Sequence, residues 1–246
     1  MNWVVHKIGG TSVAVAERYR NVAALLAREA GERKAVVVSA MSGVTDALLA
    51  LVELATKRES YGEKLAELEK RHVETARALV PAAEAERLAI VFAEGARDVA
   101  DVLRAVWLGK SSSELTRELV AGYGEIWSAQ MLAAHLRASG ADAEWLDART
   151  VLTVSPGELG PSVDFEGSTA RMRAWVESHA SCNLLVVTGY IASTPEGVPT
   201  TLKRNGSDFS ASIFGALLGA DTITIWTDVD GVLSADPRRV PEAVVV

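Results

Sequence analysis

The sequence lacks the features that mark several large classes of protein. Its single cysteine, Cys182, cannot form an internal disulfide, which excludes a disulfide-stapled fold and is typical of a reducing cytoplasm. We expect Cys182 to be a plain buried thiol. Long apolar runs are missing too, both in the opening MNWVVHK and later, so neither a signal peptide nor a membrane span is predicted. These absences favour a cytoplasmic protein.

Excess positive charge is lacking as well. The chain has 25 Lys and Arg against 32 Asp and Glu, a net charge of -7. This balance argues against nucleic acid or an anionic membrane as a partner, so any phosphate site must be local. Disorder is also disfavoured, because 49% of the 246 residues are hydrophobic and 23% are charged. With no repeat or obvious linker, we expect one domain.

Short β-branched runs alternate with longer helical patterns, which predicts an α/β fold with a largely parallel sheet. Both faces of these runs are apolar, so we expect helices on both sides of the sheet. In such sheets ligands bind beyond the carboxyl ends of the strands. The clearest predicted strands are residues 3–8, 35–40, 183–189 and 221–227.

Apolar residues at helical spacing predict the helices. A helical pattern over 61–108 contains Pro81, which should divide it into two helices. The pattern over 115–139 contains Gly122 and Gly124, where we expect an interruption. The other predicted helices are residues 13–30, 44–56 and 168–178.

The first candidate site is KIGGTS, Lys7 to Ser12, at the end of the first strand. Gly9 and Gly10 would let backbone amides approach an anion, and a helix starting near Val13 would point its dipole there. The pattern is not a Walker loop. A structural turn and a phosphate cradle therefore both stay open.

Two further stretches offer polar groups at strand or helix ends. In VVVSAMSGVTDALL a strand ends in Ser39, and Ser42 and Thr45 follow as either helix N-caps or a seat for a small carboxylate. In GYGEIWSAQML, Glu125 follows two glycines, and we expect it to open a helix. Its carboxylate could serve the helix dipole or a ligand.

The last two stretches are charged turns. In LKRNGSDFSASIF the pair Lys203 and Arg204 precedes a turn and a helix capped by Ser207 or Asp208, which favours an anion-facing loop. In IWTDVDGVLSADPRRVP the carboxylates lack EF-hand spacing, so a nucleotide-facing loop is favoured over a metal cage. The histidines have no metal-ligand spacing, and we interpret all four as surface or structural residues: His6, His72, His135 and His179.

In this order, KIGGTSV, VVVSAMSGVTD, GYGEIWSA, RNGSDFSA and WTDVDGVLSADPR closely resemble the aspartate kinase branch of the amino acid kinase family. The similarity runs over the whole chain. It implies a three-layer α/β/α sandwich with a mainly parallel central sheet. It also implies ATP-dependent phosphorylation of the side-chain carboxylate of L-aspartate to 4-phospho-L-aspartate, for lysine, threonine and methionine synthesis.

The resemblance also implies roles on the aspartate side of the site. Glu125 would bind the substrate ammonium, and Arg204 would bind its α-carboxylate, which a guanidinium can grip with two hydrogen bonds. Ser39 and Thr45 would hold the carboxylate to be phosphorylated, with Ser207 nearby. Because that carboxylate is already ionised, no strong general base is required.

On the nucleotide side, the resemblance makes Lys7 the catalytic cation and Asp208 the residue that orients it. Mg2+ would enter with ATP, since it usually keeps several waters and few protein ligands. The phosphates and the rest of ATP would contact Lys7, Gly9, Gly10, Thr11, Ser12, Thr227, Asp228, Asp236 and Arg238.

Family members continue past Val246, into regulatory ACT domains or a fused enzyme such as homoserine dehydrogenase. We therefore interpret residues 1–246 as an amino acid kinase catalytic domain whose carboxyl-terminal part is missing, from a full-length protein expected to be a homo-oligomer. Family members commonly have glycine at the position of Lys203. Two alternatives stay open: a fragment that binds aspartate or nucleotide without turnover, and a related kinase with another carboxylate acceptor.

Overall fold

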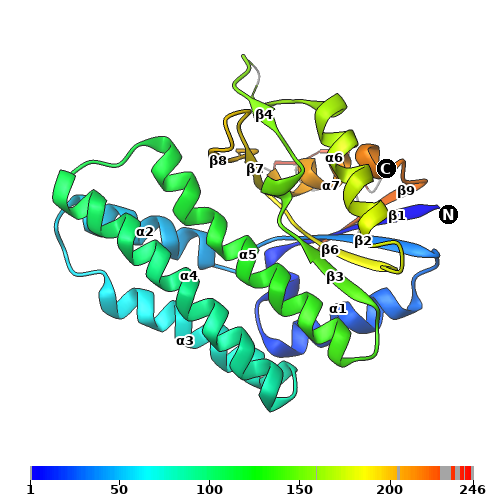
Figure 1. The fold of residues 1–246 in the computed structure, drawn as a ribbon, viewed down its shortest axis with the longest axis horizontal. Coiled ribbons are helices and arrows are strands. Elements are labelled where there is room, and N and C mark those ends of the chain that lie inside the picture. Colours follow the sequence, from blue (N-terminus) through cyan, green and yellow to red (C-terminus); the bar gives the residue numbers. More distant parts are fainter. Residues whose placement is uncertain are drawn as a thin grey trace.

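The computed structural model describes residues 2–158, 160–203, 206–227, 234–235, 239–240 and 242–244. Helices and strands alternate along the chain, as predicted (Figure 1). The α-helices are α1 Ala16–Arg28, α2 Val44–Thr56, α3 Gly62–Leu79, α4 Ala82–Gly109, α5 Glu114–Ala138, α6 Phe165–Ser178 and α7 Gly206–Leu218. Two 3-10 helices are η1 Gly10–Val13 and η2 Ala148–Thr150.

The central sheet is parallel throughout its described strands, in the order β3-β6-β2-β1-β9. Its strands are β1 Trp3–Ile8, β2 Arg33–Val38, β3 Ala143–Leu146, β6 Leu184–Thr188 and β9 Thr222–Trp226. Two small antiparallel pairs lie beside it: β4 Val154–Ser155 with β5 Ser162–Val163, and β7 Ile191–Ser193 with β8 Pro199–Thr201.

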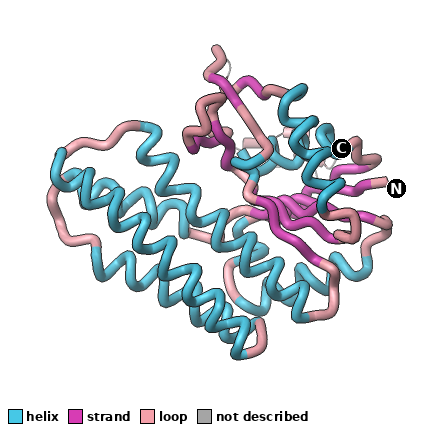
Figure 2. The backbone as a smooth tube through the Cα atoms, in the orientation of Figure 1, coloured by secondary structure: helices cyan, strands magenta, loops and turns pink. Residues whose placement is uncertain are grey.

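Two cores flank the sheet, because alternate residues of a strand point to opposite faces. On β2, Val36 and Val38 pack with α1 and α5, whereas Ala35 and Val37 pack with the layer that contains α6 and α7. Figure 2 shows these helices on the two sides of the strands. The predicted α/β/α sandwich with a parallel sheet is therefore confirmed.

The edge strand β9 departs from the prediction that helices cover both faces of every strand. Ile223 and Ile225 are 43% and 48% exposed. Among the described residues, β1 is the only strand paired with β9. The apolar side chains of β9 therefore remain partly exposed to water, unlike those of the inner strands.

Helices project from one side of the sandwich, and the outer pair α3 and α4, which pack on α2 and α5, is here named the helical extension (Figure 1). Pro81 lies between α3 and α4, so the predicted break in the 61–108 pattern is confirmed. Inside the extension, His72 packs edge-on against Phe92 and Trp127 with ring centroids 5.7 and 4.9 Å apart. These rings join the extension to the core around α1 and α5.

The expected interruption of α5 at its two glycines is wrong, because α5 is continuous from Glu114 to Ala138. A Cβ at Gly122 would lie 2.9 Å from Ile191, and one at Gly124 would lie 2.8 Å from Ala40. The glycines therefore serve close packing of a regular helix rather than a bend.

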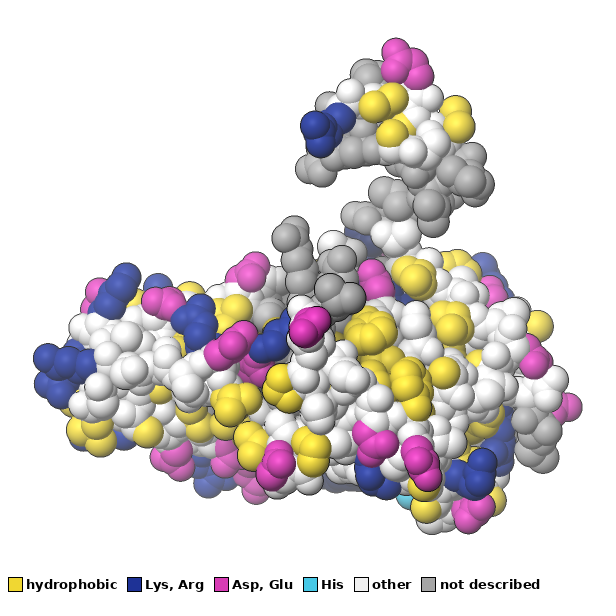
Figure 3. All heavy atoms as spheres, turned by 90° about the horizontal axis from the view of Figure 1, so that it is seen from above, with side chains coloured by type: hydrophobic (Ala, Val, Ile, Leu, Met, Phe, Trp, Pro, Cys, Tyr) yellow, Lys and Arg dark blue, Asp and Glu magenta, His cyan; other side chains and the backbone are white. Residues whose placement is uncertain are grey.

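Among the residues with described structure, no helix has both the length and the apolar character that crossing a membrane demands. Acidic, basic and apolar side chains are interspersed on the face shown in Figure 3.

Candidate active site

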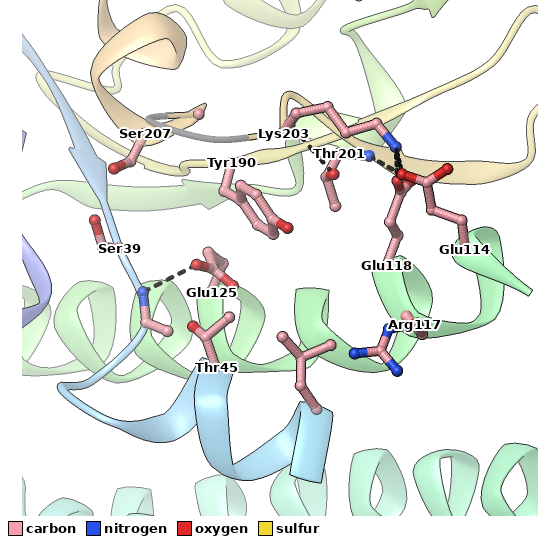
Figure 4. Close-up of a pocket in the computed structure, with 13 residues that line it drawn as sticks. Ser39, Thr45, Glu114, Arg117, Glu118, Glu125, Tyr190, Thr201, Lys203 and Ser207 are labelled. Atoms are coloured by element: carbon pink, nitrogen blue, oxygen red, sulfur yellow. Dashed lines mark hydrogen bonds and ion pairs between the residues drawn. The ribbon is translucent and has the colours of Figure 1, made fainter. Parts of the chain in front are cut away.

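A cavity of about 490 Å³ opens at the carboxyl edge of the sheet, where β1, β2 and β6 end. It contains four residues predicted to bind substrate: Ser39, Thr45, Glu125 and Ser207 (Figure 4). They come from the β2 end, α2, α5 and α7, which are far apart in the sequence. The complete lining is Ser39, Ala40, Thr45, Leu49, Glu114, Arg117, Glu118, Glu125, Tyr190, Thr201, Lys203, Gly206 and Ser207.

Ser39 and Thr45 occupy the cavity for simple backbone reasons. Ser39 follows β2, and its N–H donates to the carbonyl of Ile8, 3.1 Å away, which continues the strand pairing by one residue. Gly43 then turns the chain with φ 78, a left-handed conformation that favours glycine, and α2 begins. Gly43 is the N-cap without a side-chain hydrogen bond, so the expectation that Ser42 or Thr45 caps α2 is wrong. The Thr45 side chain can therefore face a ligand.

The expectation that Glu125 opens a helix is wrong, because Glu125 lies in the middle of α5. Its side chain is 4% exposed. One carboxyl oxygen, Oε1, accepts a hydrogen bond from the Ala40 N–H at 3.3 Å, and the other, Oε2, has no hydrogen-bond partner among the described residues. Burial raises the pKa of Glu125 to about 8, partly offset by the bond from Ala40. A cation in the cavity would stabilise the ionised form.

Lys7 and Asp208 form an ion pair beside this cavity. The Lys7 ammonium lies 2.7 Å from Oδ1 of Asp208. Lys7 shares the β1 face of Trp3 and Val5, which pack toward α7, and Asp208 lies in the first turn of α7. Asp208 directly follows the cavity residue Ser207, so the pair brings a cation to the cavity's edge.

The glycines of KIGGTS have different surroundings. A Cβ at Gly10 would lie 2.7 Å from the Ala40 carbonyl oxygen, so Gly10 is required for the close approach of two strand-end loops. A Cβ at Gly9 would lie 3.5 Å from the Lys7 ammonium nitrogen, the one atom within 4 Å among the described residues beyond its chain neighbours. Thr11 and Ser12 lie in η1, and α1 begins at Ala16 rather than near Val13. A phosphate cradle at this loop stays a prediction.

The remaining predicted nucleotide and substrate residues are mostly not described. Thr227 follows β9 at the same edge of the sheet. Arg204, Asp228, Asp236 and Arg238 lie outside the described residues. Within the part of the chain that is described, no three His, Cys, Asp or Glu side chains cluster as metal ligands would.

The structure adds cavity residues that the sequence interpretation missed. Glu114 and Glu118 line the cavity together with Glu125. Intervals of four and seven residues put them on one helix face, a signal that was available in the sequence. Tyr190 also lines the cavity, with a left-handed φ of 67. In the sequence, the only indication of Tyr190 was its position just after a predicted strand that ends in a glycine.

The fold and this cavity define an α/β protein with a small-molecule site at the carboxyl ends of parallel strands. Residues 2–246 match the amino acid kinase family, and the chain belongs to that family.

The resemblance to aspartate kinases is confirmed by individual relatives. The chain is 45% identical over 249 residues to bifunctional aspartokinase/homoserine dehydrogenase 1, chloroplastic, of Arabidopsis thaliana, covering 100% of this chain and 27% of the relative. It is 36% identical over 241 residues to bifunctional aspartokinase/homoserine dehydrogenase 2 of Escherichia coli, covering 97% of this chain and 29% of the relative. The chain thus spans about a quarter of the length of these relatives.

A solved structure agrees. E. coli aspartokinase III in complex with aspartate and ADP superposes with a TM-score of 0.81 at 29% identity, over 99% of this chain and 53% of that chain. The same enzyme with lysine and aspartate gives a TM-score of 0.84 at 27% identity, with the same coverage.

Proposed function

We propose that this chain carries the catalytic region of an aspartate kinase, which transfers the γ-phosphoryl group of MgATP to the side-chain carboxylate of L-aspartate. The product is 4-phospho-L-aspartate, an intermediate of amino-acid biosynthesis. The observation that carries the proposal is the buried Glu125 carboxyl, whose Oε2 lacks a hydrogen-bond partner among the described residues while the residue lines a cavity together with Ser39, Thr45 and Ser207. The aspartokinase relatives support the choice of substrate.

Glu125 would bind the substrate through charge. A buried carboxylate without a counter-ion is unfavourable, and an ammonium group entering the cavity would supply one. Arg204 follows Lys203 of the cavity lining in the chain and is proposed to bind the α-carboxylate. An amino acid, which carries both groups, fits this pair better than a nucleotide acceptor does.

The reacting carboxylate would lie against the hydroxyls of Ser39, Thr45 and Ser207. One of its oxygens attacks the γ-phosphorus, a new O–P bond forms, and the bond from that phosphorus to the β,γ-bridging oxygen breaks to release ADP. The attacking carboxylate carries no proton at neutral pH, so the protein must align it and neutralise charge rather than remove a proton.

Lys7 would supply that neutralisation. Its ammonium is held by Asp208 at the cavity edge, in position to approach the transferred phosphoryl group. We propose that Gly9, Gly10, Thr11, Ser12, Thr227, Asp228, Asp236 and Arg238 contact ATP. Mg2+ would bind chiefly the ATP phosphates, a mode that needs few protein ligands.

The test is aspartate-dependent ADP release, with the acyl phosphate trapped by hydroxylamine as a hydroxamate. Lys7→Ala should lower kcat about a thousandfold, because a preorganised positive charge at the transferring group is lost. Lys34→Ala is the matched control: this lysine lies on the neighbouring strand β2, at the opposite end of the register, and donates to the Leu26 carbonyl. It should leave turnover unchanged.

The outcomes separate the alternatives. Calorimetric binding of aspartate without ADP release would support a binding fragment, and turnover of a different carboxylate alone would support a related kinase. Absence of aspartate binding would overturn the role given to Glu125, and a normal rate in Lys7→Ala would overturn that of Lys7.

A further inference from the structure

Lys203 has an unusual backbone conformation for its residue type. Its φ is 62, in the left-handed region that glycine adopts freely and a lysine adopts only at a cost. It follows hairpin strand β8 by two residues and precedes α7. A strained non-glycine residue persists where surrounding contacts hold it, so the contacts of Lys203 are informative.

The Lys203 side chain crosses to α5 and pairs with two carboxylates. Its ammonium lies 2.7 Å from Oε1 of Glu114 and also bonds Oε1 of Glu118 (Figure 4). Although partial burial disfavours the charge on Lys203, these two carboxylates raise its pKa above the usual value. The cation is thus engaged with the protein and does not face the cavity as a free charge.

Glu118 makes this pairing more than a surface contact. It is 6% exposed, and its second oxygen, Oε2, accepts from the Thr200 hydroxyl at 2.6 Å and the Thr201 N–H at 3.2 Å. Exposed ion pairs contribute little to stability, but removing the cation from a buried carboxylate is strongly destabilising, because an unpaired charge stays buried. Glu118 therefore fastens both β8 and Lys203 to α5.

The same segment is anchored at its other end. The Gly206 N–H donates to the Lys203 carbonyl at 3.0 Å, so Lys203 lies directly against the start of α7. Ser207 lines the cavity, and Asp208 holds Lys7 at 2.7 Å. The amino end of α7 is thus tied to α5 on one side and to β1 on the other.

We propose that Lys203 and Glu118 are positioning residues that fix the amino end of α7 against α5 and thereby hold this segment, with Ser207, at the cavity. The inference rests on the proposed function for its effect on aspartate, and on the contacts alone for its effect on the segment. It assigns Lys203 a role in aspartate affinity and none in the phosphoryl transfer step.

The test combines kinetics with hydrogen exchange of the peptide over residues 199–210. Lys203→Ala and Glu118→Gln should each raise KM for aspartate about tenfold, as loss of a hydrogen bond to a charged group implies, with kcat changed less than about twofold. Lys203→Gly should behave alike, because glycine accepts the backbone conformation but cannot form the ion pairs. Lys203→Arg should restore KM to within about threefold, since a guanidinium can pair with both carboxylates.

Lys110→Ala is the matched control. Lys110 also has a left-handed φ, 53, is exposed at the end of α4, and does not line the cavity. It should change neither KM nor exchange. Melting temperatures of all variants separate loss of position from loss of fold.

Each outcome decides the proposal. Faster exchange over 199–210 together with raised KM in Lys203→Ala and Glu118→Gln supports it. Unchanged exchange and KM in both variants overturn it. If the wild-type protein neither binds nor phosphorylates aspartate, the proposed function fails, and the exchange measurement alone then decides whether Lys203 holds the segment.

Discussion

The helical extension and the cavity each contain a buried ionisable side chain that lacks a counter-ion among the described residues, His72 and Glu125, and the two differ in what surrounds them. His72 of α3 lies between Phe92 and Trp127, donates from Nδ1 to the Leu68 carbonyl at 2.7 Å, and borders none of the described cavities. Glu125 of α5 borders a cavity of about 490 Å³. In each, one polar atom lacks a hydrogen-bond partner within the described structure. Burial alone therefore does not mark a site, whereas burial beside open volume and hydroxyl groups does.

The comparison predicts that changes in the extension affect stability and changes in the cavity affect function. The largest expected effect is in the extension. Phe92→Ala removes a fully buried ring and should lower the free energy of unfolding by about 4 kcal/mol. Denaturant titration measures this loss. At a temperature where the variant is folded, kcat/KM should stay within about twofold, and a large fall in it would break the separation of the two regions.

Glu125→Gln, in the cavity, should weaken aspartate binding without lowering stability at neutral pH. The native carboxyl has a pKa of about 8 against 4.5 when exposed, so stability is fully present below pH 4.5 and is lost as pH rises toward 8. Glutamine does not ionise, so its stability relative to wild type should grow by about 3 kcal/mol between pH 4.5 and pH 7. Aspartate affinity should fall about a hundredfold because the ammonium loses its counter-charge. Unfolding curves at both pH values and calorimetry test this, and a variant that binds aspartate normally would remove Glu125 from the site.

His72→Phe tests the extension, where the pH dependence of stability should have the opposite sign from that at Glu125. Burial lowers the pKa of His72 to about 4 from 6.5, so its neutral form suits the fold above pH 6.5 and stability is lost as pH falls below that value. Phenylalanine keeps a ring against Phe92 and Trp127 without titrating. Its stability relative to wild type should increase by about 2 kcal/mol between pH 6.5 and pH 5. Parallel unfolding curves for both proteins over that range would show that His72 does not titrate as its burial implies.

The smallest effect is expected at the surface of the extension. Arg77 and Glu86 form an ion pair at 3.1 Å with both side chains more than half exposed. Arg77→Ala should change the free energy of unfolding by less than about 0.5 kcal/mol and leave activity unaltered. Thermal unfolding at low and high salt measures it. A loss above about 1 kcal/mol would contradict the expectation that an exposed ion pair of the extension contributes little to stability.

Periodicity predicted the fold where elements are long. Residues 44–56 repeat apolar side chains over thirteen positions, and α2 has those bounds. The strand β3 and the β7–β8 hairpin were missed, because runs of three or four residues, one of them interrupted by Glu144, are too short to show a period. The continuity of α5 was missed because the contacts of Gly122 and Gly124 are tertiary and leave no local trace.

The site was predictable where polar residues follow a strand. Ser39 comes directly after β2 and Thr45 lies in the first turn of the helix that follows, and parallel strands bring such ends together. The 2.7 Å pairing of Lys7 with Asp208 agrees with the expected orientation of that lysine, although its role in the reaction stays a prediction. Glu118 was missed although its helical spacing from Glu125 was visible, but its pairing with Lys203 and the backbone conformation of Tyr190 depend on the three-dimensional fold and could not be predicted.

The close approach of α5 to its neighbours sets how near Glu125 lies to the strand ends. Gly122 and Gly124 bring the helix to distances from Ile191 and Ala40 that a methyl group could not occupy. Glu125 is the next residue, so the span between its carboxyl group and the strand ends is set by two absent side chains. Larger residues at these two positions would move α5, and Glu125 with it, away from the strand ends. With Glu125 in its proposed role, such a change would shift the preferred acceptor to a longer amino acid.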